Sequence, residues 1–318
     1  MKNLKYIFMV LLGGTMYGTM SSFVKLSYTK GFNAAEISFW QAFIAALLLA
    51  IYAFSTRKNI KGKLTFGNFI FLLFTGSAIG LTNFFYYESV SYISASLAIV
   101  ILMQFTWFSL LLEWLIFKSK PSKPELITVS FILVGTIMAG NILGAEAWEF
   151  SMKGVLFALS SSLTYTVYII ANSRVSKSVR WQTKSMVIMM GSSLCLFSIN
   201  SEIILSSDYL NDKFFCWAIF LAVVGTTVPT ALFASGISKI GAGISSILMT
   251  VELPVAIICA RIVLKEQIGS LQVVGIVIML ASICIMNYYK VYKFKRLKSS
   301  KNAYNSAISK KRSGCFGR

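Results

Sequence analysis

Apolar stretches of membrane-spanning length recur along the whole chain, and short polar connections separate them. A helix needs about 20 mainly apolar residues to cross a bilayer. The pattern predicts an all-α polytopic membrane protein of about ten transmembrane helices, without an inserted soluble domain. The expected spans lie at 4–26, 34–55, 66–89, 93–117, 125–143, 153–173, 184–205, 214–236, 242–264 and 270–289.

The ninth of these stretches interrupts its apolar pattern with Glu252 and Pro254. An ionisable group at mid-membrane depth costs about 2.5 kcal/mol or more, so it should face protein or a water-filled cavity. A proline loosens the helix about one turn earlier, here around Thr250. A carboxylate beside a helix break is typical of a solute site in a transporter. The alternative is a buried Glu held by a neighbouring hydroxyl or amide, with Pro254 as a packing kink.

Two parts of the chain resemble one another at a fixed spacing. A shift of 147 residues places Ala95 on Ala242 and Lys118 on Lys265, with one apolar run over the other and no gap. A repeat of five helices is odd in number, so the second copy must be inverted relative to the first. We therefore expect two inverted five-helix repeats at 1–145 and 146–289, followed by a basic, disordered cytoplasmic tail at 290–318.

The loop charges then predict the orientation, because cytoplasmic loops of membrane proteins are enriched in Lys and Arg. With the N-terminus inside, inner loops hold twelve basic residues and outer loops four. The outer four are Lys30, Lys153, Lys213 and Lys265. Both termini are thus expected in the cytoplasm, and the protein in the plasma membrane as a multi-pass chain.

Composition narrows the chemistry. Charged residues make up 13% of the chain, the mean hydropathy is +0.72 and there is no His. The absence of His excludes an imidazole base and His-ligated zinc or haem. The five Cys residues form no Cys-x-x-Cys motif. No catalytic residues, no metal site and no cofactor are expected, and no phosphate-binding loop of Gly-x-x-x-x-Gly-Lys-Ser/Thr type occurs.

The net charge of +19 includes ten basic residues after Tyr289. Such a tail, like the basic inner loops, is suited to anionic lipid headgroups. Nucleic acid is not expected as a partner, whereas a small-molecule solute is, and a homodimer is a possible assembly.

The region from Lys239 to Gly269, with its acidic-x-Pro element and terminal Leu-Lys-Glu-Gln-Ile-Gly, resembles the ninth helix of the drug/metabolite transporter superfamily, and in particular its EamA-type branch. Lys265 stands where that branch often has Gly, and Glu266 matches its Glu. Tyr17-Gly18 stands where the family has Trp-Gly. The resemblance covers about 285 residues and implies export of amino acids or related metabolites, or occasionally drug efflux.

Few polar side chains fall inside the expected spans, and these are the candidate solute-binding residues: Glu252, Gln104, Asn83, Tyr17, Tyr165 and Trp107. Glu252 could bind an amine or exchange a proton, since burial raises the proton affinity of a carboxyl group. The amides offer donors and acceptors, and the aromatic rings offer flat walls. Amides and tyrosines also commonly bridge membrane helices without touching a ligand.

Gating and hinge positions are expected at the helix breaks and at the external ends. Pro254 and Pro229 are the candidate hinges. Glu88 and Glu36 could pair with Lys25 or Arg261 as an external gate, or each could simply extend to the headgroup region. Lys265-Glu266 is interpreted as a surface turn.

These features predict a secondary transporter, not an enzyme. It would export small metabolites such as amino acids across the plasma membrane by alternating access, with proton coupling through Glu252 as one form of the mechanism. The alternatives are an efflux carrier for drugs or cationic compounds and a membrane-embedded lipid-modifying enzyme. The enzyme would need clustered acids or a Cys nucleophile, whereas the chain offers isolated Glu residues.

Overall fold

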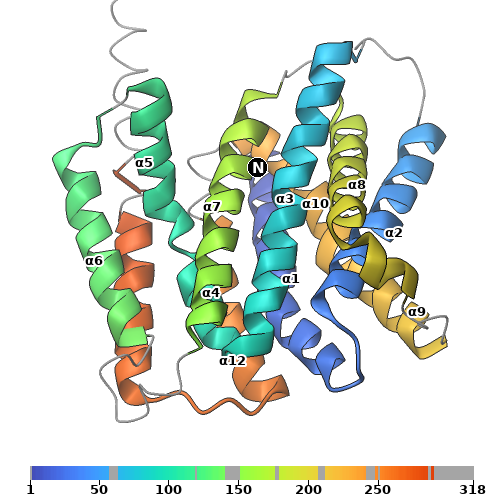
Figure 1. Ribbon diagram of the computed structural model, residues 1–318. Helices are drawn as coiled ribbons and strands as arrows, with labels where there is room; N and C mark the ends of the chain where they lie inside the picture. Colours follow the sequence, from blue (N-terminus) through green and yellow to red (C-terminus); the bar gives the residue numbers. More distant parts are fainter. Residues whose placement is uncertain are drawn as a thin grey trace, which may run out of the picture.

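The computed structural model describes residues 2–56, 64–118, 120–139, 151–175, 179–206, 212–240, 248–249, 251–285 and 288–289. The predicted basic tail at 290–318 lies outside them. Over the described residues all regular structure is helical, and these helices run up and down in one bundle (Figure 1). The expected all-α fold is confirmed.

The first half contains six helices. They are α1 (Lys2–Tyr28), α2 (Ala34–Ser55), α3 (Phe66–Tyr92), α4 (Ala95–Leu102), α5 (Phe105–Phe117) and α6 (Lys123–Ala139). In the second half the helices are α7 (Met152–Arg174), α8 (Trp181–Ser206), α9 (Asp212–Phe220), the π-helix η2 (Leu221–Thr227), α10 (Val228–Ile240), α12 (Glu252–Val263) and a last helix, Ser270–Ile285. By length and hydropathy, 7 described segments can each cross a membrane. The expected fourth span is α4 with α5, and the eighth is α9, η2 and α10.

Packing between the halves is two-fold related, as inverted repeats require. α3 packs on α7, and the equivalent helices α10 and α1 pack on each other. α3 also packs on α8, just as η2 packs on α2. α5 packs on α7, just as its equivalent α12 packs on α1, and α2 packs on its own equivalent, α8. α1 begins, and the last helix ends, at the upper side of Figure 1.

Backbone geometry repeats at the expected spacing of 147 residues. α5 begins at Phe105 and α12 at Glu252, which are 147 positions apart. In the described chain, two residues other than glycine have positive φ: Lys118 at 53° and Lys265 at 56°. These two residues are also 147 positions apart. Left-handed backbone is unfavourable for a residue with a Cβ. Gly, which the resemblance leads us to expect at the position of Lys265, adopts this backbone without that cost.

Small residues bring α3 and α8 close together. An added Cβ at Gly76 would lie 2.0 Å from the carbonyl oxygen of Ile188, and one at Gly191 would lie 2.3 Å from that of Leu73. Only residues without a Cβ permit this approach. These glycines therefore fix the crossing at which the two halves meet.

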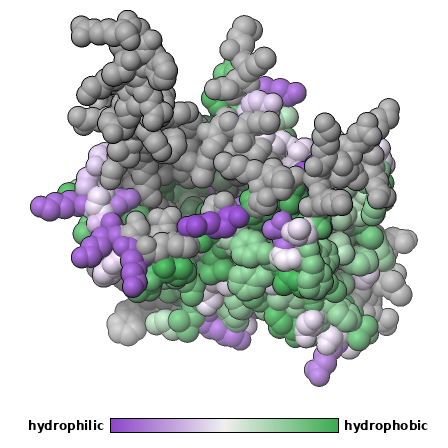
Figure 2. All heavy atoms as spheres, turned by 90° about the horizontal axis from the view of Figure 1, so that it is seen from above, coloured by the Kyte–Doolittle hydropathy of each residue, from purple (hydrophilic) through white to green (hydrophobic). Residues whose placement is uncertain are grey.

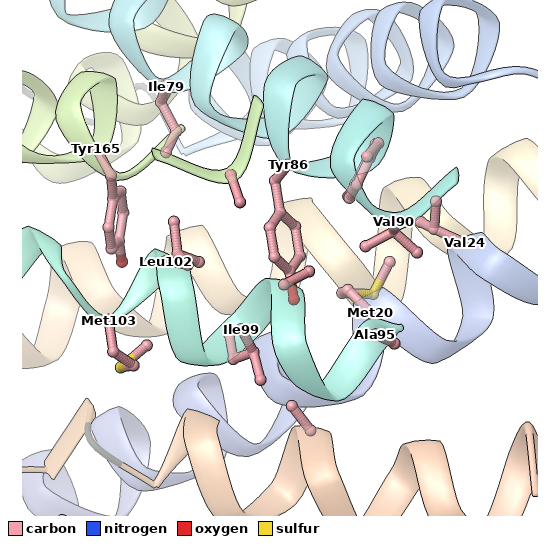
Figure 3. Close-up of a cluster of buried hydrophobic side chains, with 14 of the residues drawn as sticks. Met20, Val24, Ile79, Tyr86, Val90, Ala95, Ile99, Leu102, Met103 and Tyr165 are labelled. Carbon is pink, nitrogen blue, oxygen red and sulfur yellow. The ribbon is translucent and has the colours of Figure 1, made fainter. Parts of the chain in front are cut away.

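The bundle has an apolar core and an apolar outer surface. Met20, Tyr86, Ile99 and Met103 belong to one buried cluster between α1, α3 and α4 (Figure 3). Outward-facing side chains are hydrophobic as well, and Ile262 on α12 is 72% exposed. Broad hydrophobic areas are visible in Figure 2, with a few hydrophilic side chains projecting from them. Such a surface is suited to lipid rather than water.

Candidate functional site

Glu252 is the first residue of α12 and lies against α1 in the interior of the bundle. The residue is only 4% exposed. Its Oε1 atom is buried and has no hydrogen-bond partner among the described residues. A buried polar atom without a partner carries a free-energy cost, and such atoms in native proteins commonly have a functional reason.

Two glycines on α1 bring this carboxyl group to the middle of the interface. A Cβ at Gly18 would lie 2.7 Å from the carbonyl oxygen of Glu252 and 3.0 Å from Val255 Cβ. A Cβ at Gly14 would lie 2.9 Å from Val251 Cγ1. The stripe Gly14-x-x-x-Gly18 is therefore the surface on which the start of α12 rests.

Pro254 is the third residue of α12, in its first turn. The N–H groups of the first turn have no partner inside a helix, so proline is tolerated there. The expected break lies directly before Glu252, where Val251 donates its N–H to Leu248 O at 3.3 Å. Thr250 itself lies outside the described residues. The start of a helix carries a partial positive charge, which favours a carboxylate beside it.

Tyrosine side chains from both halves interact with this position. Electrostatic interactions link Glu252 with Tyr17, Tyr86 and Tyr165. Tyr17 of α1 stacks on Phe233, with ring centroids 5.6 Å apart, and Tyr165 of α7 packs edge-on against Phe105 at 5.1 Å. Tyr86 and Tyr165 both point from their helices towards α4 in Figure 3. The hydroxyl of Tyr86 is buried and has the hydroxyl of Ser21 on α1 as its polar neighbour.

A polar network next to this site holds the π-helix. Tyr87 donates its hydroxyl to Gln41 Oε1 at 2.9 Å, and Gln41 Nε2 donates to Thr226 Oγ1 in η2. η2 ends at Thr227, two residues before Pro229, the expected second break. A proline removes one N–H and crowds the carbonyl four residues earlier, which accounts for the wider helical turn. The sequence gave no sign of the partners of Gln41.

The other predicted binding residues are placed on α3 and α5. The Gln104 amide occupies the break between α4 and α5, where it donates to Val100 O at 3.2 Å and Thr136 Oγ1 at 2.6 Å. It also accepts the Trp107 indole N–H at 2.9 Å. Asn83 lies on α3, about one turn before Tyr86 and Tyr87, and is partly buried. Gln104 and Trp107 thus contact one another rather than Glu252.

Lys25 and Glu88 line one cavity of about 520 Å³, together with Tyr28 and Asn33. Lys25 forms an ion pair at 3.4 Å with Glu266, which the sequence analysis treated as part of a surface turn. Glu88 has Lys153 as its electrostatic neighbour. Glu36 is part of a capping box with Asn33 at the start of α2, and the spacing Asn-x-x-Glu could have indicated this.

A second cavity of about 210 Å³ is lined by Ser94, Ser96, Glu266 and Gln272, among others. Glu252 lines neither of these two cavities. Both are on the side where α3 ends and α4 begins. The expected water-reachable chamber beside Glu252 therefore remains a prediction.

The family model of the EamA-like transporter family matches the chain twice, over residues 4–140 and 152–288. The chain belongs to the EamA-like transporter family. Its two matches correspond to the two halves of the bundle, and this EamA protein is a polytopic membrane protein of the transporter class.

Curated relatives of this EamA protein are named as uncharacterized transporters. One from Clostridium kluyveri is 24% identical over 93% of this chain and 97% of its own length. YcbK of Bacillus subtilis is 21% identical over 84% of this chain and 87% of its own. One from Synechocystis is 24% identical, and the match spans 64% of this chain and 62% of that relative. A solved crystal structure has the same fold, with a TM-score of 0.60 at 12% identity over 87% of this chain and 96% of the other.

Proposed function

We propose that the protein is a secondary transporter that exports small metabolites such as amino acids by alternating access. The observation that carries this proposal is the buried carboxyl group of Glu252. One of its oxygens has no hydrogen-bond partner among the described residues, and the group lies at a helix start where the two inverted halves meet. An ionisable side chain inside a membrane protein is by default a candidate for solute or proton binding. Transporter sites built from inverted repeats lie at such interrupted helices.

Glu252 would bind the amine of the solute, and the proton could alternate with that amine on the same carboxyl group. Tyr17, Tyr86 and Tyr165 would form the walls, because tyrosine rings pair an apolar face with a polar edge. Asn83 is close enough in sequence to Tyr86 to share this wall. Gln104 and Trp107 would act on the solute only if the break between α4 and α5 rearranges, since their polar groups already bond to one another.

Pro229 and Pro254 would be the hinges. The π-helix before Pro229 is held by the Gln41 amide, and a π-helical turn is often found at a functional site. The protein would lie in the plasma membrane with both termini in the cytoplasm, contacting anionic lipid through its basic inner loops.

Efflux of cationic compounds is a second candidate, favoured by the aromatic lining. A carboxylate flanked by aromatic rings also suits a flat organic cation. The two candidates differ in the solute, so both can be tested in one assay.

The test is solute flux in proteoliposomes, with and without a pH gradient, for wild type and Glu252→Gln. Glutamine keeps the shape of the side chain and removes its charge. Loss of a charged hydrogen bond to the solute should lower the flux at least about tenfold. Glu202→Gln is the matched control, because Glu202 on α8 is exposed.

Amino acids and a cationic dye should be compared in the same vesicles. Flux of Glu252→Gln equal to that of wild type and Glu202→Gln, with the same pH dependence, would remove Glu252 from the mechanism.

A further inference from the structure

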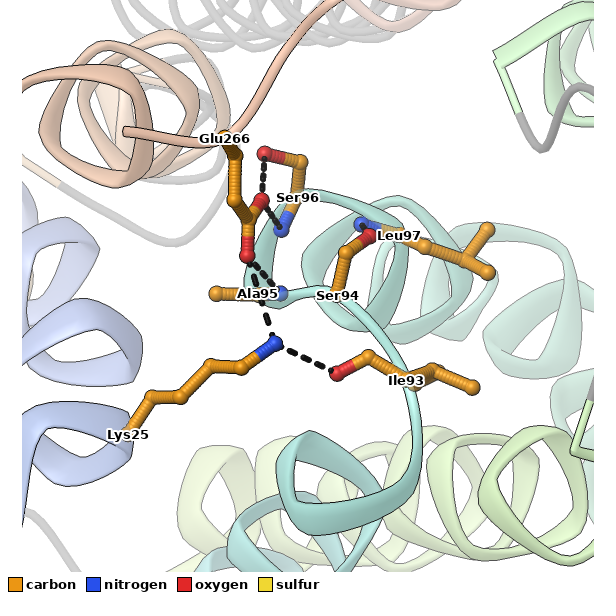
Figure 4. Close-up of polar contacts among 7 residues, drawn as sticks. All are labelled: Lys25, Ile93, Ser94, Ala95, Ser96, Leu97 and Glu266. Carbon is orange, nitrogen blue, oxygen red and sulfur yellow. Dashed lines mark hydrogen bonds and ion pairs between the residues drawn. The ribbon is translucent and has the colours of Figure 1, made fainter. Parts of the chain in front are cut away.

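Glu266 follows α12 and extends its carboxylate over the start of α4 (Figure 4). Its Oε1 accepts the N–H of Ala95 at 2.8 Å and lies 3.4 Å from Lys25 Nζ. Its Oε2 accepts the N–H of Ser96 at 3.2 Å and the hydroxyl of Ser96 at 2.7 Å. The Lys25 ammonium also donates to Ile93 O at 3.0 Å. One side chain of the second half thus bonds to two helices of the first.

These bonds are stronger together than a surface ion pair. Lys25 and Glu266 side chains are 32% and 14% exposed, and an ion pair of that kind alone contributes little. The N–H groups at a helix start, however, have no partner inside the helix, and they favour an anion. Ser94 caps Leu97 N–H at 3.2 Å, and Glu266 takes the N–H groups of Ala95 and Ser96. Without Glu266, these two donors and Lys25 would need other acceptors.

The cluster of Lys25, Ala95, Ser96 and Glu266, here called the clasp, contributes side chains to the walls of two cavities. Lys25 lines the cavity of about 520 Å³, whereas Ser96 and Glu266 line the cavity of about 210 Å³. Val100, one turn further along α4, lines the second cavity and is 1% exposed.

The clasp has no charged counterpart in the other repeat. The position equivalent to Glu266 is Ser119, 147 residues earlier. A serine cannot form the ion pair that Glu266 forms with Lys25. A carboxylate-based closure is therefore specific to the side of the molecule on which α1 ends and α4 begins.

We propose that the clasp is the gate on this side of the molecule, and that solute passes here only after Glu266 leaves the start of α4. This gate rests on the proposed transport function. Glu266 holds the gate by bonding to the start of α4 and to Lys25, and it does not bind the solute itself.

Thiol accessibility tests the gate without any solute. In a chain with its native cysteines replaced by serine, Val100→Cys places a thiol behind the clasp. Glu266→Gln should raise its alkylation rate by a membrane-impermeant maleimide at least about tenfold, since a charged acceptor is lost. Lys25→Met should raise the rate less, and the neighbouring exposed Lys265→Met should leave it unchanged. An unchanged rate in both Glu266→Gln and Lys25→Met would overturn the proposal.

A charge exchange separates the clasp from a simple ion pair. Lys25→Glu combined with Glu266→Lys restores opposite charges but leaves the Ala95 and Ser96 N–H groups facing a cation. Alkylation of the thiol should therefore stay fast in this double variant. Restored protection would show that charge pairing alone closes the gate, against the proposed role of the α4 start.

A reversible cross-link tests whether the gate must open. Ser96→Cys and Glu266→Cys, joined by a short reducible bifunctional thiol reagent, should stop solute flux, and reduction should restore it. Flux that continues in cross-linked protein would overturn the gate. Accessibility that responds to Glu266→Gln in a protein without flux for any solute would instead contradict the proposed function.

Discussion

Gly76 shows how single atoms control the packing of this membrane protein. It lies where α3 crosses α8, and an added Cβ would meet the backbone oxygen of Ile188 rather than a movable side chain. The backbone of a packed helix cannot shift locally, so the two helices would have to separate. The sequence showed the small residues, but not which helix each one touches.

We predict that Gly76→Ala lowers the free energy of unfolding by about 3 kcal/mol, the upper range for overpacking a core. Gly67→Ala is the matched control, because an added Cβ there would have no packing neighbour from elsewhere in the described chain within 4 Å. Alanine favours a helix over glycine, so this control should be neutral or slightly stabilising. Thermal unfolding of the detergent-solubilised proteins measures both. Equal stability of the two variants would contradict the close crossing.

The residue scale is also where sequence-based prediction of the site was weakest. The burial of Glu252 inside the bundle was predictable from one acid in an apolar stretch, because that pattern depends only on local hydropathy. Glu266 was missed, because its partner Ala95 is 171 positions away. Gln104 was predicted as a binding residue, and the direction of its amide could not be known before α6 was placed beside it. Side-chain orientation depends on neighbours that a single sequence does not place.

At the scale of elements, the interrupted helices are the features that join local sequence to mechanism. The break between α4 and α5 contains no proline, and Met103 and Gln104 form the turn. The Gln104 side chain holds the turn by bonding to Thr136 of α6 and to Trp107 of α5. This break was not predicted, since the apolar pattern runs through it without interruption. The π-helix before Pro229 was predicted only as a break of unspecified form.

Gln104→Leu should therefore loosen the α4–α5 break. The change removes two good hydrogen bonds and leaves the Trp107 indole N–H without its acceptor, at a cost of about 1–3 kcal/mol. Hydrogen–deuterium exchange should rise around residues 101–108 in the variant. Gln267→Leu is the control, because Gln267 is exposed in the turn after α12. Exchange that is unchanged in Gln104→Leu would show that the amide does not hold the break.

At the scale of the whole molecule, the inverted repeat was the most predictable feature. A shift of 147 residues aligned the apolar runs, and the same shift relates the helix starts at Phe105 and Glu252 and the left-handed residues Lys118 and Lys265. Hydropathy and turn positions depend on residue type rather than on exact identity. The two repeats therefore still match in these features although they share few identical residues. The contacts between halves follow from the two-fold arrangement once the repeat is known.

The charge pattern of the loops makes a further prediction about the whole molecule. If basic loops face the cytoplasm, Thr29→Cys should react with a membrane-impermeant thiol reagent on intact cells, because residue 29 follows α1 on the opposite side. Lys120→Cys, in the turn after α5, should react only after the membrane is permeabilised. Both positions are exposed, so reactivity reports on the side of the membrane. The reverse pattern of labelling would show that the protein is inserted the other way round.

Glu252 and Glu266, the carboxylates of the candidate site and of the clasp, lie at opposite ends of α12. α12 has Glu252 at its first residue and is 12 residues long, or about 18 Å at 1.5 Å per residue, and Glu266 follows three residues after its end. A short helix of this kind moves as a rigid unit. A solute that tilts α12 by binding at Glu252 would therefore also displace the residues after Val263, including Glu266. Solute binding and the opening of the clasp would then be coupled through α12.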